Sequence, residues 1–331
     1  MDWIHSLPDG AILVGPFGEI TAANAIAEDI LQTHLLGLAA SHIIRNPAFA
    51  PTLALVRESG QSNTIDIEFH GRPQRQVSAF LSQLNSKGEI LIVLRDLTRE
   101  QAVEKMRSDF VANASHEMRT PLAAIMGSIE TLQGAAKNDA KAREMFLGSM
   151  LTQAQRMKRL IDDLLTLSRI ELNEHVRPDN KVSLTAIAAQ AKNNLANLAA
   201  ECGVSVALVS DGEIFVSGNA DELLEVALNL IENAIKYGAD KARVEVACAV
   251  RGRDGIFSVK DSGQGIAEDH IPRLTERFYR VRTKESRARG VTGLGLAIVK
   301  HIVLRHRGNL DIRSVAGQGS TFAVSIPLYN S

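Results

Sequence analysis

The chain has 331 residues, 45% of them hydrophobic, which is enough apolar material for two or three domains with cores of their own. Its 37 basic and 38 acidic residues nearly cancel, so no bulk charge draws it to nucleic acid or to a membrane surface, and we expect no direct nucleic-acid binding. The two cysteines, Cys202 and Cys248, have no metal-ligand spacing around them, which excludes a zinc site at either position.

The sequence also lacks the pattern of a membrane-spanning segment. No stretch approaches the roughly 18 uncharged apolar residues that a spanning helix requires. The first ten residues contain Asp2, His5 and Pro8 and do not form a signal peptide. We therefore expect a cytoplasmic protein. Membrane association would be indirect, or would use a segment preceding these residues, which would place the chain at the cytoplasmic face of the inner membrane.

Residues 1–97 have the pattern of a small α/β domain. A turn at residues 8–10 precedes the apolar run 11–14. Apolar and acidic residues alternate along 64–69, which is the period of a half-buried strand. This strand and residues 77–84 are predicted to form a hairpin.

Residues 98–175 change to the pattern of long helices. Apolar residues spaced by three and four continue to about residue 132, stop at 134–139, and resume from 157 to 170. Two helices of about 30 residues with a short connection form an antiparallel hairpin. One hairpin cannot enclose a core, so we expect a second copy of the chain to cover its apolar stripe in a homodimeric four-helix bundle. The alternative is an interdomain helical linker packed on its neighbours.

Residues 178–331 mix helices and strands. Helices are predicted at 184–200 and 220–236, and strands at 244–250, 256–260, 310–314 and 321–327. This alternation indicates an α/β sandwich with helices on one face of a mixed sheet. The whole chain is therefore predicted to be a multi-domain α+β protein.

The first helix of the hairpin carries His116 close to a proline. Pro121 removes a helical hydrogen bond and clashes with the carbonyl of Glu117, which predicts a kink one residue from His116. A neutral imidazole nitrogen can take up a phosphoryl group, and Glu117 could orient the ring. Thr120 lies four residues on, on the same face. An ordinary surface histidine beside an acid is the alternative.

A helix downstream presents two amides on one face. Asn229 and Asn233 are four residues apart, and Glu225 lies one turn earlier. Together with Lys236 they can hold the water shell of a metal ion and the phosphates that the ion bridges. A pair of capping or solvated asparagines is the alternative.

Two glycine loops complete the pattern. Asp261, Gly263 and Gly265 follow an apolar strand, where closely spaced glycines let the backbone approach a ligand. The aspartate can accept a hydrogen bond from an exocyclic amine such as that of adenine. Gly293 and Gly295 precede an apolar helix, whose free N–H groups suit a phosphate.

A basic stretch lies between the two glycine loops. We interpret it as a lid over the phosphates, and a solvated charge run is the alternative. Its cationic residues are Arg280, Arg282, Lys284, Arg287 and Arg289.

In this order, the motifs of residues 99–331 resemble those of the bacterial sensor histidine kinases. The phospho-acceptor box matches residues 116–122, the asparagine box 229–237, the first glycine box 261–266, the phenylalanine box 276–280 and the second glycine box 290–296. Residues 163–171 are similar to the usual end of the second bundle helix. The resemblance implies an ATP-binding domain of the histidine kinase, gyrase and chaperone type at 178–331 and a phosphotransfer hairpin at 98–175.

The resemblance also implies roles in catalysis. His116 would receive the γ-phosphoryl group of ATP with Glu117 as the assisting base. Thr120 matches the position that orients water to remove phosphate from the partner protein. Asn233 would bind Mg²⁺, and Asn229 would help to place it.

The same resemblance implies the nucleotide contacts. Lys236 would meet a phosphate, Tyr237 would border the nucleotide and Asp261 would bind adenine. Val291 departs from the family, because many members carry a glycine there. The other residues expected around the nucleotide are Gly263, Gly265, Ile266, Phe278, Thr292, Gly293, Leu294, Gly295 and Leu296.

Residues 1–97 resemble a PAS sensor domain more weakly, through residues 7–10, 18–24 and 95–98. They contain no cysteine, which excludes a cysteinyl-flavin photoreceptor. His5, His34 and His42 could be proposed as haem ligands, but their surroundings do not mark a haem pocket.

With its upstream PAS-like domain, the stretch 108–116 is similar to phosphate-regulon sensor kinases. The implied partners are the receiver domain of a response regulator and a second copy of the chain, bound through residues 98–175. A degenerate kinase that binds nucleotide without turnover is the alternative. An ATPase of the gyrase and chaperone clan is a poorer one, because it has no use for His116 beside Pro121.

Overall fold

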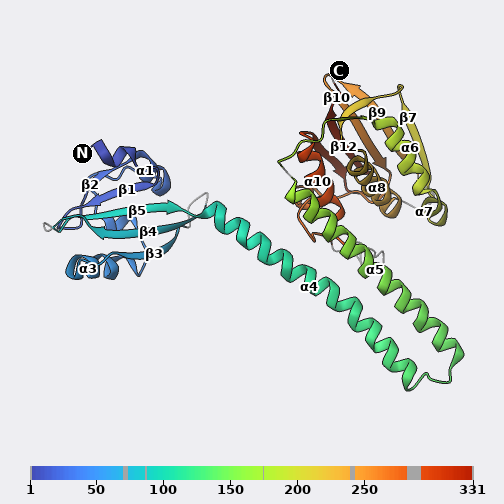
Figure 1. Cartoon of the computed structure of the whole chain (residues 1–331), viewed down its shortest axis with the longest axis horizontal. Helices are drawn as coiled ribbons and strands as arrows, with labels where there is room; N and C mark the ends of the chain where they lie inside the picture. The colour runs from blue at the N-terminus through green and yellow to red at the C-terminus, as the bar shows by residue number, and fades with distance from the viewer. Residues whose placement is uncertain are drawn as a thin grey trace. The chain divides into compact units, whose positions relative to one another are not determined.

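The computed structural model describes residues 2–69, 74–85, 88–173, 175–238, 243–281 and 292–329 (Figure 1). By its contacts the chain forms two compact units, Met1–Ala112 and Asn113–Ser331. The boundary between them falls inside one continuous helix, α4 (Thr98–Gln133).

The first unit contains a five-stranded antiparallel sheet in the order β2-β1-β5-β4-β3. The predicted hairpin is confirmed, because β3 pairs with β4 and places Ile65 opposite Ala79. The elements of this unit are η1 (Asp2–Ser6), β1 (Gly10–Val14), β2 (Ile20–Ala23), α1 (Ala25–Leu31), α2 (Ala40–Ile43), α3 (Phe49–Ser59), β3 (Asn63–Phe69), β4 (Arg75–Gln83) and β5 (Ile90–Asp96).

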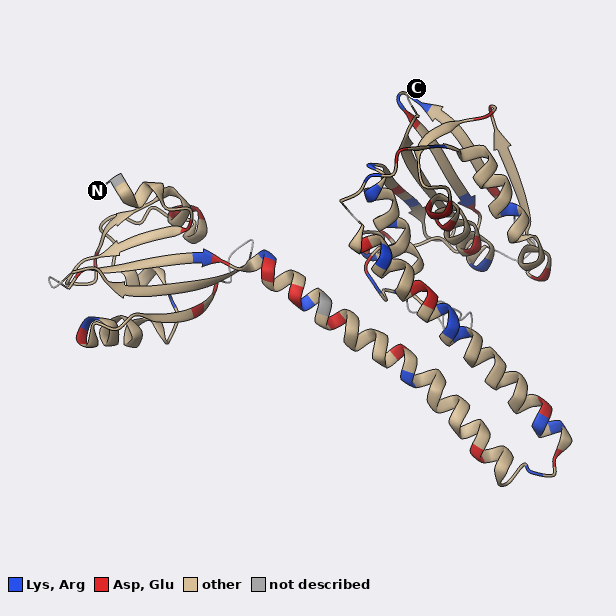
Figure 2. Cartoon of the chain, viewed as in Figure 1, with Lys and Arg blue, Asp and Glu red and all other residues tan. Residues whose placement is uncertain are grey.

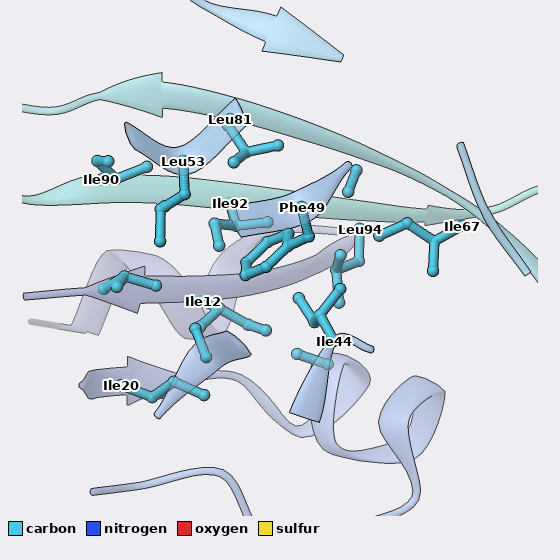
Figure 3. Packing of buried hydrophobic residues seen from close by; sticks show 14 of the residues in the cluster. Ile12, Ile20, Ile44, Phe49, Leu53, Ile67, Leu81, Ile90, Ile92 and Leu94 are labelled. Carbon is cyan, nitrogen blue, oxygen red and sulfur yellow. The ribbon is translucent and has the colours of Figure 1, made fainter. Parts of the chain in front are cut away.

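The core of this unit lies between the sheet and its helices. Phe49 of α3 is fully buried and packs with Ile12 and Ile92 of the central strands (Figure 3). Asn24 is also buried, and its Oδ1 accepts hydrogen bonds at 2.9 Å from the N–H groups of Ala11 and Ala27. One polar side chain thus caps α1 and ties it to β1, which satisfies backbone donors that burial would otherwise leave unpaired.

The second unit begins with the helical hairpin. The C-terminal part of α4 is followed by α5 (Ala140–Leu172), which begins where Asp139 accepts hydrogen bonds from two backbone N–H groups of its first turn. Acidic and basic residues are interspersed along both helices (Figure 2). Many apolar side chains remain exposed on the hairpin of the single chain, among them Leu122, Met126, Ile129, Leu151, Ile161 and Leu165.

The rest of this unit is a mixed sheet in the order β11-β12-β10-β9-β7, in which only the β7–β9 pair is parallel among the described strands. The two short strands β6 (Asn180–Ser183) and β8 (Phe215–Gly218) pair separately. The remaining elements are α6 (Leu184–Asn194), α7 (Ala196–Glu201), β7 (Ser205–Ser210), α8 (Ala220–Tyr237), β9 (Arg243–Arg251), β10 (Asp254–Asp261), η2 (Glu268–Arg273), α10 (Gly295–Arg305), β11 (Asn309–Val315) and β12 (Gly319–Pro327).

Helices α6, α8 and α10 bury apolar faces in this part of the chain. Leu230 and Ile231 of α8 and Ile298 of α10 are fully buried, as are Val246 and Val259 of the sheet. The predicted mixed sheet with a helical layer is therefore confirmed. The helix predicted at 184–200 is divided at Leu195 into α6 and α7.

Candidate functional site

A cavity of about 500 Å³ lies between α8, the end of β10, the start of α10 and α5. It brings together most of the residues predicted to surround the nucleotide. These are Asn229, Asn233, Lys236, Tyr237, Asp261, Gly265, Ile266, Thr292, Gly293, Gly295 and Leu296.

Three residues predicted for the nucleotide site support the wall of the cavity and do not line it. A Cβ atom added at Gly263 would lie 2.1 Å from the carbonyl oxygen of Tyr237, so the loop lies directly on the end of α8. The backbone N–H of Phe278 donates to the carbonyl of Gly293 at 2.8 Å. Leu294 is fully buried just before α10.

Asp261 is the last residue of β10, and its side chain lines the cavity. The residue is 6% exposed, and its Oδ1 accepts a hydrogen bond of 2.8 Å from the N–H of Gly263. Burial raises the pKa of Asp261, while hydrogen bonds from the backbone at Gly263 and Ser320 oppose the shift. Such a carboxyl can accept a hydrogen bond from an amine of a planar ligand seated in the cavity.

Two glycines allow parts of the wall to come unusually close. Gly265 has a φ of +65°, and a Cβ there would lie 2.0 Å from the carbonyl oxygen of Val315. A Cβ at Gly295 would lie 2.3 Å from Oδ1 of Asn229. The glycine spacing in the sequence thus corresponds to two close approaches, one between loop and strand and one between α10 and α8.

Helix α8 supplies amide and carboxylate oxygen atoms to one wall of the cavity. The Nδ2 of Asn229 donates to the carbonyl and to Oε1 of Glu225, at 3.0 and 2.8 Å. Asn233 lines the cavity one turn later, and Lys236 pairs with Glu232 at 2.5 Å. Amide and carboxylate oxygens are the ligands that Mg²⁺ prefers, so the donor set fits this ion. No cluster of three His, Cys, Asp or Glu side chains suited to a metal occurs among the residues that the structure describes.

Helix α5 closes the cavity with residues that sequence reasoning did not select for the site. Arg159 and Asp163 line it, and Oδ2 of Asp163 accepts a hydrogen bond of 2.6 Å from Oγ1 of Thr292. Burial raises the pKa of Asp163 to about 6, the hydrogen bond from Thr292 opposes this, and the nearby carboxylates Glu225 and Glu232 add to it. The resemblance of residues 163–171 to a bundle helix contained no signal for this contact.

His116 lies exposed on α4, outside the cavity. Oγ1 of Thr120 donates to the carbonyl of His116 at 3.3 Å. Oε2 of Glu117 accepts hydrogen bonds from Arg156 of α5 at 3.1 Å and from Arg280 at 2.8 Å. Because Arg280 also lines the cavity, it connects the cavity to the residue beside His116.

The kink predicted at Pro121 and the lid predicted between the glycine loops both stay predictions. Helix α4 continues through Pro121 as a single element, although the proline has no N–H for the Glu117 carbonyl. Arg280 belongs to the described residues, while the other cations of the proposed lid, together with Gly290 and Val291, lie outside them.

No helix in the described part of the chain is long and apolar enough to cross a membrane.

Two family models match the second unit and the helix leading into it. The His Kinase A (phospho-acceptor) domain matches residues 106–173, and the histidine kinase-, DNA gyrase B- and HSP90-like ATPase matches residues 218–330. Among curated proteins, the phosphate regulon sensor protein PhoR of Pseudomonas aeruginosa is 35% identical over 96% of this chain and 71% of its own length. The sensor protein SrrB of Staphylococcus aureus is 27% identical over 98% of this chain, which spans only 55% of SrrB.

Two solved structures share the fold. The histidine kinase ThkA, solved in complex with the response regulator protein TrrA, aligns over 99% of this chain and 98% of its own with a TM-score of 0.55 and 17% identity. The Acinetobacter baumannii histidine kinase AdeS aligns over 65% of this chain and 98% of its own with a TM-score of 0.52 and 24% identity.

Proposed function

Because the chain belongs to the sensor histidine kinases of two-component systems, with PhoR among its relatives, we propose that it transfers the γ-phosphoryl group of ATP to His116. It is a protein-histidine kinase with an ATP-binding domain. The assignment of His116 as the acceptor rests on Arg280, which connects the cavity to the residue beside His116. This side chain lines the cavity and donates to Glu117, the neighbour of His116 in the sequence.

In this proposal the cavity holds the nucleotide and its metal ion. The Asp261 carboxyl accepts a hydrogen bond from the amine of adenine, and Tyr237 borders the nucleotide. Lys236 leaves Glu232 to meet a phosphate. Asn233 and Asn229 hold Mg²⁺, which supplies charge neutralisation for the phosphates when it is bound.

At the acceptor, one neutral ring nitrogen of His116 attacks the γ-phosphorus. A nitrogen–phosphorus bond forms, the bond from phosphorus to the bridging oxygen breaks, and its electron pair leaves with ADP. The proton on the other ring nitrogen passes to Glu117, the assisting base. The phosphoryl group then passes to an aspartate on the receiver domain of a response regulator, the class of partner named in the ThkA complex.

The reverse activity and the dimer belong to the same proposal. Thr120 orients water for dephosphorylation of the regulator, one helical turn from His116. The apolar residues left exposed on the hairpin support a homodimer through residues 98–175, because a second copy would bury them.

We also propose a sensor role for residues 1–97. A five-stranded antiparallel sheet in the order β2-β1-β5-β4-β3, with helices over one face, supports a PAS-like domain. Its cluster of buried residues is apolar and packs the helices against the sheet.

Labelling of the purified chain with γ-labelled ATP and Mg²⁺ tests the assignment of the acceptor. His116→Gln is expected to abolish acid-labile labelling while nucleotide binding survives. The matched control is His175→Gln, at another exposed histidine of the second unit, which keeps full labelling. Undiminished acid-labile labelling of His116→Gln contradicts the proposal. A wild-type chain that binds nucleotide without labelling supports the scaffold alternative.

A further inference from the structure

The carboxylate of Glu117 is shared between two arginines from different parts of the second unit. Its Oε2 accepts from Nη2 of Arg156 at 3.1 Å and from Nη2 of Arg280 at 2.8 Å. All three side chains are half-buried: the side chain of Glu117 is 30% exposed, that of Arg156 24% and that of Arg280 21%. Charge-assisted hydrogen bonds of this kind hold a carboxylate more firmly than neutral ones do.

The two arginines differ in how they are attached to Glu117. Arg156 lies on α5, the second helix of the same hairpin, so its contact is internal to the hairpin. Arg280 follows η2, and its Nη2 also donates to the carbonyl of Thr292 at 3.1 Å at the edge of the nucleotide cavity. A movement that separates the nucleotide-binding part from the hairpin would break the Arg280 contact and would leave the Arg156 contact, which is internal to the hairpin.

A base at position 117 needs such a fixed partner. Side chains one residue apart on a helix point about 100° apart and do not face each other, so adjacency alone does not aim Glu117 at the His116 ring. Both arginine contacts use Oε2, which makes Oε1 the oxygen suited to accept the ring proton. Holding Oε2 toward α5 restricts the carboxylate to a small set of rotamers around that orientation.

We propose that Arg156 is a positioning residue that holds Glu117 as the proton acceptor for His116 throughout phosphoryl transfer. The inference rests on the proposed function and adds a residue of α5 to it. During transfer Arg156 makes no bond to the phosphoryl group, and its guanidinium keeps its proton. The effect of Arg156 is therefore exerted through Glu117 alone.

Single-turnover labelling of His116 in the chain of residues 1–331, as a function of ATP concentration, tests the proposal. Arg156→Gln is expected to lower the maximal rate by about tenfold or more, part of the 10²- to 10⁴-fold that a positioned acid or base contributes. The KM for ATP should stay within about twofold, because Arg156 is not among the residues lining the cavity. Arg156→Lys should restore most of the rate by returning a cation to the same position.

The matched control is Lys158→Gln, which removes an exposed cation of α5 whose ion-pair partner, Asp162, is on the same helix. It should label at the wild-type rate. In a Glu117→Gln background, Arg156→Gln should cause no further loss, whereas a merely structural role would lower the rate by the same factor in both backgrounds.

Each failure has a separate signature. Labelling of Arg156→Gln at the wild-type rate, or a loss that is undiminished in the Glu117→Gln background, overturns the role of Arg156 while the wild-type chain still labels on His116. Absence of labelling in the wild-type chain overturns the proposed function itself.

Discussion

Oγ1 of Thr292 donates a hydrogen bond of 2.6 Å to Oδ2 of Asp163, although the two residues lie 129 positions apart in the sequence. The bond joins α5 to the loop before α10, where Thr292 Oγ1 also accepts from the N–H of Leu294 at 3.3 Å. The same side of α5 makes further contacts, since Arg277 pairs with Glu171 at 2.5 Å. The hairpin and the nucleotide-binding part are thus linked through side chains that can ionise.

Asp163 should make this link sensitive to pH. Burial raises its pKa from 3.8 to about 6, so the folded state binds a proton more tightly than the unfolded chain does. Its contribution to stability is therefore fully present below pH 3.8 and is lost as the pH rises through about 6. Asp163→Asn keeps an acceptor for Thr292 without the charge. The melting temperature of the variant minus that of the wild type should increase from pH 5 to pH 7.5.

The control for this measurement is Asp162→Asn, at the neighbouring exposed carboxylate that pairs with Lys158. The melting temperature of Asp162→Asn minus that of the wild type should stay constant between pH 5 and pH 7.5. A difference for Asp163→Asn that stays constant with pH would show that the carboxyl does not titrate in this contact.

Asp261→Asn should weaken nucleotide binding strongly. Asparagine can still accept from the N–H of Gly263, but it replaces a charged acceptor in the cavity with a neutral one. Hydrogen bonds to charged groups contribute about 1.5–3 kcal/mol, which corresponds to a loss of affinity of roughly 10- to 100-fold. Calorimetric titration with a non-hydrolysable ATP analogue measures it. The control is Asp254→Asn, at the opposite end of β10, which should bind the analogue with wild-type affinity. Unchanged affinity of Asp261→Asn would contradict the assignment of adenine to this carboxyl.

Gly265→Ala should destabilise the protein more than Gly252→Ala. Both glycines have a positive φ, +65° and +62°, so alanine pays about 1–2 kcal/mol of backbone strain at either position. Only at Gly265 would the new Cβ also meet a backbone oxygen, that of Val315 at 2.0 Å, whereas the space at Gly252 is open. The urea concentration at the midpoint of unfolding should therefore be lower for Gly265→Ala than for Gly252→Ala. Of the two variants, only Gly265→Ala should bind nucleotide more weakly than the wild type. Equal unfolding midpoints would contradict the close approach.

Protonation of His306 should lower the stability of the folded protein in acid. The histidine is fully buried, its Nε2 accepts from the N–H of Asn219 at 3.0 Å, and its Nδ1 donates to the carbonyl of Ile302 at 2.8 Å. Burial lowers its pKa below the ordinary 6.5, so the stability that it contributes is present above pH 6.5 and is lost as the pH falls through the lowered value. The side chain joins the end of α10 to the start of α8.

Substitution of this histidine provides the check. His306→Gln should lower the free energy of unfolding by about 1–3 kcal/mol at pH 7.5, since a buried hydrogen-bonding pair is disrupted. The loss should shrink toward pH 5, because the wild type then bears the cost of protonation and the variant does not. The exposed His42→Gln should match the wild type at both pH values. A loss for His306→Gln that does not change with pH would mean that His306 stays neutral throughout.

The parts of this molecule that the sequence predicts are those governed by local periodicity. Alternation in the β3 segment gave a correct hairpin, and the four-residue spacing of Asn229 and Asn233 correctly placed both amides on one wall of the cavity. The division of the predicted helix at Leu195 was missed, because no glycine or proline marks the break. The weaker signal is the three asparagines around it, Asn193, Asn194 and Asn197, which are poorer helix formers than alanine or leucine.

Contacts between distant segments could not be predicted in the same way. The pair of Arg280 with Glu117 spans 163 positions, and the surroundings of Asp163 depend on how α5 packs against α10. Such pairs follow no helix or strand period, because they depend on how whole elements pack. His306 was passed over for the same reason, since a histidine at the end of an apolar helix does not reveal its partner at Asn219.

The hydrogen bond from Thr120 to the carbonyl of His116 has a kinetic consequence. While the hydroxyl donates to its own helix, its proton is not available to a water molecule, so the proposed hydrolysis would begin with a rotation of the hydroxyl or of the side chain. Exposed side chains make that rotation in picoseconds to nanoseconds. Release of the Thr120 hydroxyl is therefore expected to be fast, and in the proposed reaction the lifetime of a phosphorylated regulator would be set by slower events of docking and domain movement.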